Sequence, residues 1–398
     1  MEQGLPSLPN GWHKKQLGDV VKLSQGTQVP VGDQYLEQED GLIRFLRISD
    51  FVRSDEPPRY ILNPGSQYLV EADDICMIRY GDAGRAVTGL AGALANNLFK
   101  ISPIESLLKR FLFLQLCSPR CVDYLRAANN SSTMPAISFK AVNAMEVSVA
   151  PLDEQKRIVE KLNALLTRIN TAIEHLQQSI TLADALFESS QSEIFNDVLS
   201  NYQHSTIDEI CIVTSSKRIF KADYVESGIP FYRTKEIVDL SKEKNISTEL
   251  FIDKEKFSEI CGKFGAPKKG DLLFSAVGTI GVMWIVDERE FYFKDGNLLW
   301  LKDMNGVTPE YLKSAISAVL TEKIKDRSQG AAYKAISITN LKAFEIPVPS
   351  IEEQKSIVAK IEHVSSVTKK TKQELSLQIN DLHNLKASIL DSAFKGEL

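Results

Sequence analysis

The sequence lacks the features that mark most enzymes and membrane proteins. Its 398 residues contain no G-x-x-x-x-G-K-[ST] loop for a nucleotide phosphate and no G-x-S-x-G motif for a nucleophilic serine. The longest weakly apolar run, "AVTGLAGALA", is far too short to cross a bilayer, and the opening "MEQGLPSLPNGW" is not a basic leader followed by an apolar segment. We therefore expect a non-catalytic, cytoplasmic protein without a membrane segment.

Cysteine and histidine are sparse and scattered. The five cysteines are odd in number and show no C-x-x-C spacing, and the five histidines form no H-x-x-x-H pair. We expect no metal site and no cofactor in this chain, and reduced, mostly buried thiols. The cysteines are Cys76, Cys117, Cys121, Cys211 and Cys261.

An excess of one charge is also missing from most of the chain. The formal net charge is -5, but residues 1–151 hold 15 basic and 16 acidic residues, and residues 200–350 hold 21 of each. The acidity lies in residues 152–199, with 4 basic and 8 acidic residues, whereas residues 351–398 hold 7 of each. Either balanced part can expose a local basic face, so the charge neither proves nor excludes a nucleic-acid partner.

The sequence does contain an internal duplication whose period is about half the chain. The segment "AISFKAVNAMEVSVAPLDEQKRIVEKL", from Ala136, aligns without a gap on "AISITNLKAFEIPVPSIEEQKSIVAKI", from Ala335. Upstream, "IRFLRI" resembles "IPFYRT", which places Arg47 opposite Arg233. Because the order of the similar segments is unchanged, we expect two copies of one structural unit.

Each half has the same internal plan. Residues 1–151 and 200–350 contain short β-type runs separated by Gly and Asn turns, with short helical patterns late in each half. The β-type runs are "DVVKLS", "IRFLRI", "DICMIRY", "EICIVT", "VMWIV" and "NLLWLK", and the helical patterns are "LLKRFLFLQLCSPRCVDYLRAA" and "PEYLKSAISAVLTEKIKDR". We predict an α+β protein with two mixed α/β globules.

A long helix is predicted after each globule, over residues 152–199 and 351–398. Apolar residues recur at spacings of three and four, which is typical of helices that pack along their length. The alternative is two separate amphipathic helices, each lying on its own globule. The expected seam of the first helix is Ile158, Leu162, Leu165, Ile169, Ile173, Leu176, Ile180, Ala183 and Phe187. That of the second is Ile357, Ile361, Val364, Leu375, Ile379, Leu382 and Leu385.

The repeated motif at the start of each helix carries acidic residues in the first turn. Glu154 and Glu353 meet unpaired backbone N–H groups there, and Ser350 with Glu353 fits a capping box. The E-x-K triplets that begin at these glutamates also occur in metal-dependent nucleases. Because each triplet lies on a helix and no fitting Pro-Asp pair precedes it, we interpret both as helix starts.

Polar and basic loop residues are the candidates for binding. Two G-x-x-G loops, "RYGDAGR" and "AVGTIGV", and two polar loops, "AANNSSTMP" and "RSQGAAYK", have a composition suited to contacts with DNA bases. Ordinary solvated loops have the same composition, so this alternative stays open. From loop composition and repeat alignment, the candidates are Arg47, Arg53, Arg79, Tyr80, Arg85, Asn129, Asn130, Ser131, Ser132, Lys140, Lys217, Arg218, Arg233, Lys235, Ser275, Thr279, Gln329, Tyr333 and Lys334.

The whole chain resembles the specificity subunits of type I restriction-modification systems. The resemblance rests on the order globule, helix, globule, helix and on the motifs "PLDEQKRIVEKL" and "PSIEEQKSIVAKI" at half-chain spacing. The opening "GWHKKQLGDVVKLSQGT" and the closing "LKASILDSAFKGEL" are also similar to that family.

The resemblance implies that each globule is a target recognition domain that binds one half of an asymmetric, two-part sequence in double-stranded DNA. It implies that the long helices pack as an antiparallel coiled coil, set the spacer and dock two methyltransferase subunits. Those partners would carry S-adenosylmethionine, and motor-nuclease subunits would use ATP and Mg²⁺.

Two departures affect the expected helix register. Ala150-Pro151 stands where the second copy has Pro349-Ser350, and Thr368 and Lys372 place polar residues in the second seam. Two rival functions stay open on the sequence: a protein-protein scaffold with paired helices, and an enzyme whose active site has no recognised motif.

Overall fold

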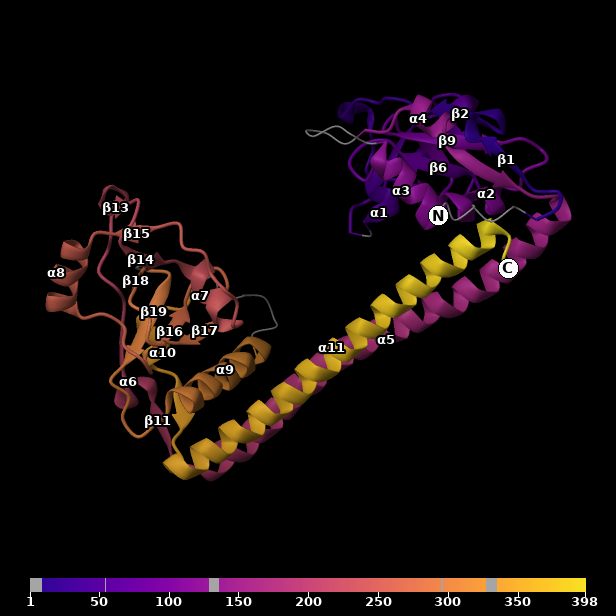
Figure 1. Ribbon diagram of the computed structural model, residues 1–398. Coiled ribbons are helices and arrows are strands. Elements are labelled where there is room, and N and C mark those ends of the chain that lie inside the picture. Colours follow the sequence, from indigo (N-terminus) through magenta and orange to yellow (C-terminus); the bar gives the residue numbers. More distant parts are fainter. Residues whose placement is uncertain (1–8, 54, 129–135, 295, 327–334) are drawn as a thin grey trace, which may run out of the picture. The chain divides into compact units, whose positions relative to one another are not determined.

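The chain forms two compact units, each built from segments that are distant in the sequence (Figure 1). The computed structural model describes residues 9–53, 55–128, 136–294, 296–326 and 335–398. Unit 1 comprises Met1–Gln178 and Leu375–Leu398, and unit 2 comprises Ser179–Glu374. Each unit therefore holds one globule and one stretch of each long helix.

The globule of unit 1 contains three small sheets. The first pairs β1 (His13–Gln16) with β10 (Glu146–Val149). The second has the order β2 (Val21–Gln25), β9 (Leu98–Pro103), β6 (Ile75–Ile78) and β7 (Ala86–Val87). The third has the order β4 (Arg59–Leu62), β3 (Leu42–Leu46), β8 (Gly92–Leu94) and β5 (Leu69–Val70).

Short helices connect these strands, and the long helix α5 follows them. They are η1 (Leu17–Asp19), η2 (Val31–Asp33), α1 (Ile48–Val52), η3 (Ser66–Tyr68), α2 (Lys109–Leu116), α3 (Pro119–Ala127), α4 (Phe139–Asn143) and α5 (Leu152–Asn201).

Unit 2 repeats the first two sheets of unit 1, and its third sheet has the fourth strand on the opposite edge. β11 (His204–Thr206) pairs with β20 (Glu345–Pro347). The next sheet has the order β12 (Ile212–Thr214), β19 (Leu298–Lys302), β16 (Leu272–Ser275) and β17 (Met283–Ile285). The third has the order β13 (Tyr224–Val225), β15 (Phe251–Ile252), β14 (Ile229–Tyr232) and β18 (Tyr292–Phe293).

The helices of unit 2 lie between and after these strands. They are α6 (Ile207–Ile210), η4 (Lys221–Asp223), α7 (Thr234–Ser241), α8 (Lys254–Phe264), α9 (Pro309–Asp326), α10 (Ile338–Lys342) and α11 (Ile351–Lys395). The parallel pair β3–β8 recurs as β14–β18, and the antiparallel pair β6–β9 recurs as β16–β19.

A long helix completes the core of each globule, and in each unit an aromatic residue near a helix C-terminus makes the contact. In unit 1, Phe394 of α11 lies edge-on to Phe111, with the ring centroids 5.2 Å apart. In unit 2, the ring centroids of Phe195, on α5, and Tyr311 are 6.3 Å apart. These four side chains are buried. The core of unit 1 therefore includes part of α11, the last helix of the chain, and the core of unit 2 includes part of α5, the helix that precedes its globule.

A buried glutamine fastens the start of each long helix to its globule. The Gln155 side chain accepts a hydrogen bond from the Leu108 backbone N–H at 2.8 Å and donates to the carbonyls of Ser106 and Ala150 at 2.9 and 2.8 Å. Gln354 repeats the pattern, since it accepts from the Thr308 N–H at 2.8 Å. It also donates to the backbone carbonyls that match those in unit 1, at 2.8 and 2.9 Å.

The predicted capping of the second helix is confirmed. Glu353 accepts hydrogen bonds from the Ser350 backbone N–H at 3.0 Å and from its hydroxyl at 2.7 Å. Both E-x-K triplets lie in the first turn of a long helix. They are therefore helix starts, as the sequence indicated.

The two long helices run antiparallel within each unit (Figure 1). In unit 1, Lys386 donates to Asn170 at 3.1 Å and Arg157 donates to the Leu398 carbonyl at 3.1 Å. In unit 2, Lys372 pairs with Asp184 at 2.6 Å, and the Tyr202 hydroxyl donates to Glu353 at 2.9 Å. The helices thus pack on each other, and the alternative of two separate helices is wrong.

The seam differs from its predicted register at two places. Leu166 is buried and Leu165 is only half-buried, because the spacing after Leu162 is four residues. Leu385 is 48% exposed, and the apolar contact passes to Leu390 instead. The polar patch predicted at Lys372 is present, and its ion pair can specify the pairing of the helices.

The expected α+β architecture is confirmed, with several short helices that the sequence did not indicate. The run "EICIVT" is confirmed as a strand only in its second half, where Ile212–Thr214 forms β12. Glu209 lies in α6, where it accepts a hydrogen bond from the Thr206 N–H at 2.8 Å. This local capping bond outweighs the β-type composition. All five cysteines are free thiols, and none of the described helices combines the length and apolarity of a membrane span.

We expect Gln155→Ala to lower the free energy of unfolding of unit 1 by about 2–3 kcal/mol, because it leaves buried backbone groups without partners. Urea unfolding of the full chain measures the change. Gln178→Ala, at an exposed position of the same helix, is the matched control and should shift stability by less than about 0.5 kcal/mol. Equal effects of the two substitutions would contradict the anchoring role.

Candidate nucleic-acid interface

Both globules form the same tight turn after a buried central strand. After β6, the Gly84 N–H donates to the Ile78 carbonyl at 2.8 Å, and after β16, the Gly281 N–H donates to the Ser275 carbonyl at 2.9 Å. Both glycines have positive φ, at +94° and +85°. A Cβ on Gly84 would lie 2.9 Å from the Leu125 Cβ, so the turn needs glycine for its conformation and for its close approach to α3.

A second segment of each globule is hydrogen-bonded beside this turn. In unit 1, the Arg79 N–H donates to the Asn97 carbonyl at 2.9 Å and the Ile137 N–H donates to the Arg79 carbonyl at 3.0 Å. Tyr80 also forms an isolated antiparallel bridge with Ala136. We call residues 79–85 and 136–140 surface 1.

Unit 2 has the equivalent arrangement. The Ala276 N–H donates to the Asn297 carbonyl at 2.9 Å, and the Ile336 N–H donates to the Ala276 carbonyl at 2.9 Å. Val277 forms a bridge with Ala335. We call residues 276–282 and 335–339 surface 2. The two surfaces thus share one backbone frame.

Surface 1 gathers four of the predicted residues. The Arg79 guanidinium lies over the Tyr80 ring, 5.2 Å from its centroid. Arg85 forms an exposed ion pair with Asp82 at 3.0 Å, and Lys140 is exposed on α4. Among the described residues, no carboxylate pairs with Arg79 or Lys140, so both cations remain available to an anionic or polar partner.

Surface 2 differs in its side chains. Thr279 is exposed, but the Ser275 side chain is fully buried and its hydroxyl has no partner among the described residues. Burial removes Ser275 from the candidate surface. Val277, which was not among the predicted residues, is 36% exposed. The repeat alignment could have identified it, because it is opposite Tyr80.

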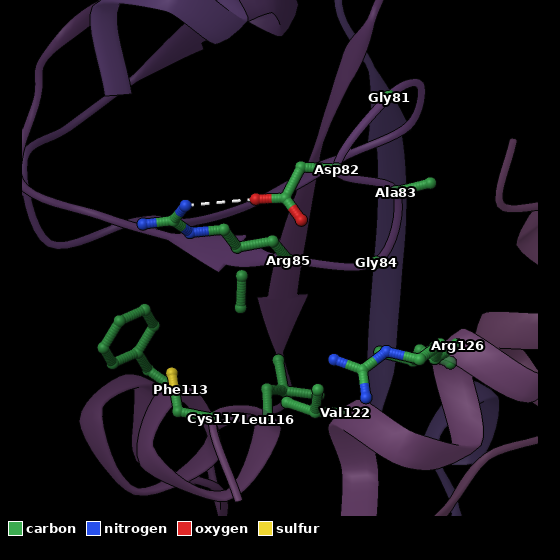
Figure 2. A pocket seen from close by; sticks show the side chains of 12 residues that line it. Gly81, Asp82, Ala83, Gly84, Arg85, Phe113, Leu116, Cys117, Val122 and Arg126 are labelled. Atoms are coloured by element: carbon green, nitrogen blue, oxygen red, sulfur yellow. Dashed lines mark hydrogen bonds and ion pairs between the residues drawn. The ribbon is translucent and has the colours of Figure 1, made fainter. Parts of the chain in front are cut away.

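An open pocket of about 540 Å³ lies beside the turn of surface 1 (Figure 2). Asp82 and Arg85 line it from the loop, while Phe113 and Cys117 of the α2 region line it from the other side. Burial raises the pKa of the Cys117 thiol to about 11, so the thiol is protonated and unreactive at neutral pH. The pocket offers an apolar wall and no nucleophile.

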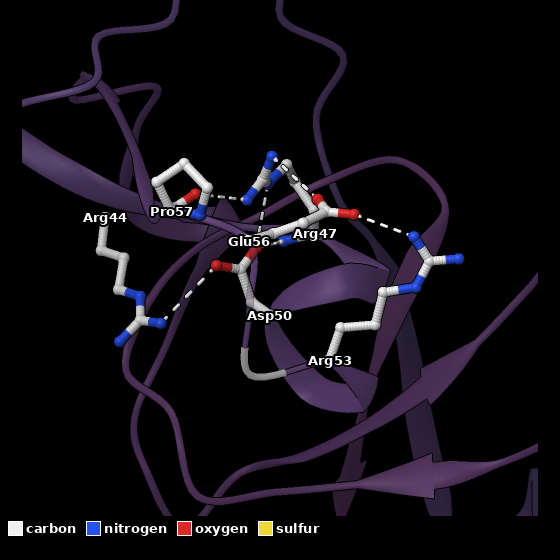
Figure 3. A network of polar contacts seen from close by, with 6 residues as sticks. All are labelled: Arg44, Arg47, Asp50, Arg53, Glu56 and Pro57. Atoms are coloured by element: carbon white, nitrogen blue, oxygen red, sulfur yellow. Dashed lines mark hydrogen bonds and ion pairs between the residues drawn. The ribbon is translucent and has the colours of Figure 1, made fainter. Parts of the chain in front are cut away.

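Arg47 and Arg233 have equivalent positions, and both are bound by buried carboxylates. Arg47 donates through Nε to Asp50 at 3.0 Å and through a terminal nitrogen to the Pro57 carbonyl at 2.9 Å (Figure 3). In unit 2, Arg233 forms an ion pair with Glu236 at 2.8 Å. Because Asp50 and Glu236 also accept from the backbone N–H groups of these arginines, each pair stabilises a strand-to-helix corner.

The remaining candidates are dispersed. Arg53 forms an exposed ion pair with Glu56, Lys217 lies over the Phe264 ring at 5.3 Å, and Lys235 and Arg218 are exposed. Phe264 is 50% exposed and lies on α8, a helix that the sequence pattern did not predict. Outside the described residues lie Asn129, Asn130, Ser131, Ser132, Gln329, Tyr333 and Lys334.

An aspartate at the start of each central strand, buried at Asp74 and half-buried at Asp271, has a different environment in each unit. Burial acts to raise the pKa of Asp74, but hydrogen bonds from Lys100 and Lys109 outweigh it and the pKa is lowered. In unit 2, burial raises the pKa of Asp271, whose carboxylate accepts from the Lys268 N–H and the Trp300 indole. Trp300 occupies the position of Lys100, so unit 2 has lost that cation.

The family model of the type I restriction modification DNA specificity domain matches residues 9–182 and again residues 200–380. The chain is 25% identical to the type I restriction enzyme EcoBI specificity subunit of Escherichia coli, over 99% of this chain and 88% of that protein. It is 26% identical to a putative type I restriction enzyme specificity subunit of Haemophilus influenzae, over 71% of each chain.

Solved structures share the fold. A chain from work on complex assembly and conformational transition of the type I R-M system has a TM-score of 0.74 at 20% identity, with 98% of this chain and 100% of that chain covered. The HsdS subunit from Thermoanaerobacter tengcongensis has a TM-score of 0.54 at 19% identity, with both chains fully covered.

We expect opposite effects of Asp74→Asn and Asp271→Asn on stability. The lowered pKa of Asp74 contributes stability above the unfolded pKa of about 4, and this is lost as the pH falls through the folded pKa. The raised pKa of Asp271 contributes to the stability of the folded state below the unfolded pKa, and this contribution is lost as the pH rises through the folded pKa. At pH 7, Asp74→Asn should therefore destabilise by about 2 kcal/mol, the contribution of a hydrogen bond to a charged group, whereas Asp271→Asn should be neutral or stabilising.

Urea unfolding of the full chain at pH 7 and at pH 4 measures both effects. The cost of Asp74→Asn should shrink at the lower pH. A marked loss of stability from Asp271→Asn at pH 7 would contradict the prediction, because it would show that the two hydrogen bonds to the carboxylate outweigh the cost of its burial.

Proposed function

This chain belongs to the type I restriction-modification DNA specificity family, and from that membership we propose that each of its globules reads one half of a two-part target in double-stranded DNA. The observation that carries the proposal is the repeated backbone frame of surfaces 1 and 2, which presents different side chains in the two globules. Two readers with one frame and different side chains would select two different half-sites. The target would then be asymmetric.

Phosphate contacts would supply much of the affinity. Lys140 and Arg85 lie at surface 1, and the Arg85–Asp82 ion pair is exposed, so Arg85 can exchange its partner for a phosphate at little cost. The near-balanced charge of each globule predicts weak binding by the chain alone. Partner subunits would strengthen it.

The long helices would set the spacer and dock two methyltransferase subunits. In support, the helices pack on each other within each unit and still expose leucines away from the seam. Leu182 and Leu186, four residues apart on α5, are 68% and 66% exposed, and Leu377 of α11 is 64% exposed. Exposed leucines at helical spacing suit burial against a partner protein.

The chemistry would belong to the partners. The methyltransferase subunits would bring S-adenosylmethionine and take an adenine out of the duplex, and motor-nuclease subunits would use ATP and Mg²⁺ for restriction. In this proposal the present chain is a cytoplasmic, non-catalytic component that selects the site.

Exchange of one globule tests the half-site assignment. Residues 1–151 are replaced by the corresponding globule of a family member with a different target, and the methylome of cells that also produce the methyltransferase is sequenced. One half of the methylated adenine motif should change while the other half and the spacer length stay the same. A motif that the exchange leaves intact would overturn the assignment.

A charge on the exposed helix face tests docking. We expect Leu182→Glu with Leu186→Glu to weaken methyltransferase binding at least tenfold, because each buried leucine contributes about 1.5–3 kcal/mol and glutamate keeps the helix propensity. Leu62→Glu, at a position that is 68% exposed in globule 1, is the matched control. Binding is measured by analytical ultracentrifugation without DNA, and an undiminished affinity of the double variant would reject this face as the docking site.

A further inference from the structure

The shared frame of surfaces 1 and 2 places unlike residues at equivalent positions. Arg79 and Ala276 have the same pair of backbone hydrogen bonds, with distances of 2.9 and 3.0 Å in unit 1 and 2.9 and 2.9 Å in unit 2. The next residues, Tyr80 and Val277, form the same isolated bridge to the segment that precedes α4 or α10. Differences between the surfaces at these positions therefore come from side chains and not from the backbone.

Arg79 is held in a way that leaves its donors unused. Its guanidinium lies over the Tyr80 ring at 5.2 Å, and within the described part of the chain no carboxylate pairs with it. This distinguishes Arg79 from Arg85, which pairs with Asp82, and from Arg47, which pairs with the buried Asp50. Stacking restricts the orientation of the planar group while its N–H donors can still bind a planar pair of acceptors.

Surface 2 has no cation at the equivalent positions. Ala276 is 1% exposed, and the side chain that reaches the surface is Val277, at 36% exposed. A valine offers only methyl groups. In the major groove of DNA, the matching feature is the 5-methyl group of thymine.

We infer that Arg79 determines specificity by binding the O6 and N7 atoms of a guanine in the half-site of globule 1, and that Val277 contacts a thymine methyl group at the equivalent place in the other half-site. This inference rests on the proposed function. Lys140, an exposed point charge on the adjacent α4, binds a phosphate and carries no base preference.

The test uses the full chain produced together with its methyltransferase subunits, with methylome sequencing as the readout. Arg79→Ala should relax one G·C position in the half-site of globule 1, with a roughly ten- to hundred-fold loss of discrimination, and leave the other half-site unchanged. Arg79→Gln should shift the preference at that position from guanine to adenine, because glutamine pairs with adenine N6 and N7. Val277→Ala should weaken one thymine preference in the other half-site.

Arg126→Ala is the matched control, because it removes an exposed arginine of the same globule that already pairs with a carboxylate, Asp123 at 3.4 Å, and it should leave the motif unchanged. The inference is overturned if Arg79→Ala leaves the motif unaltered. It is also overturned if both Arg79 variants lose methylation uniformly over all sites, because a uniform loss indicates a phosphate contact or a structural role. If the unaltered chain directs no two-part motif at all, the proposed function itself fails, and that result is distinct from a two-part motif that Arg79 does not influence.

Discussion

The fold depends on one buried amide at the start of each long helix. A glutamine carboxamide has an acceptor and two donors without a charge, and Gln155 and Gln354 use both kinds of group on backbone partners. These partners lie before α2 or α9 and at the end of β10 or β20, so the first helical turn is tied to two segments of its globule. Because both side chains are fully buried, water cannot replace the lost bonds. In both units, the same type of contact fixes the direction in which the long helix leaves the globule.

The opposite end of each helix completes a core. Phe394 packs on Phe111 in unit 1, and the Ser148 hydroxyl donates to the Phe394 carbonyl at 3.2 Å across 246 residues of sequence. Phe195 makes the matching contact with Tyr311 in unit 2. The core of unit 1 therefore includes Leu390, Ala393 and Phe394 of α11. Such distant contacts are formed late in folding, since their loop-closure entropy must be overcome first.

The sequence predicted the elements better than the contacts between side chains. Runs such as "DICMIRY" and the three-four spacing after Ile158 have periodicities that a single segment reveals, and both are confirmed. Leu165 and Leu166 are both apolar neighbours, and only the partner helix decides which one is buried. The first-turn carboxylates are predicted from the sequence as caps. The next residues, Gln155 and Gln354, make hydrogen bonds to distant backbone groups, and no local sequence pattern predicts these bonds. For the same reason, Arg47 was predicted as a DNA contact, although the structure ties it to Asp50.

The two units show which positions tolerate change and why. Gly84 and Gly281 have positive φ and leave no room for a Cβ, and the anchoring glutamines use every polar atom, so substitution at these places disturbs the fold. At Arg79 and Ala276, by contrast, only main-chain atoms make the bonds of the frame, so the same bonds form with an arginine in one unit and an alanine in the other. Even the buried Asp74 and the half-buried Asp271 accept hydrogen bonds from different partners, two lysines in one unit and an indole in the other. A frame built from main-chain bonds separates stability from the identity of the exposed side chain, and this separation is what a protein needs if two copies of one fold are to recognise different sequences.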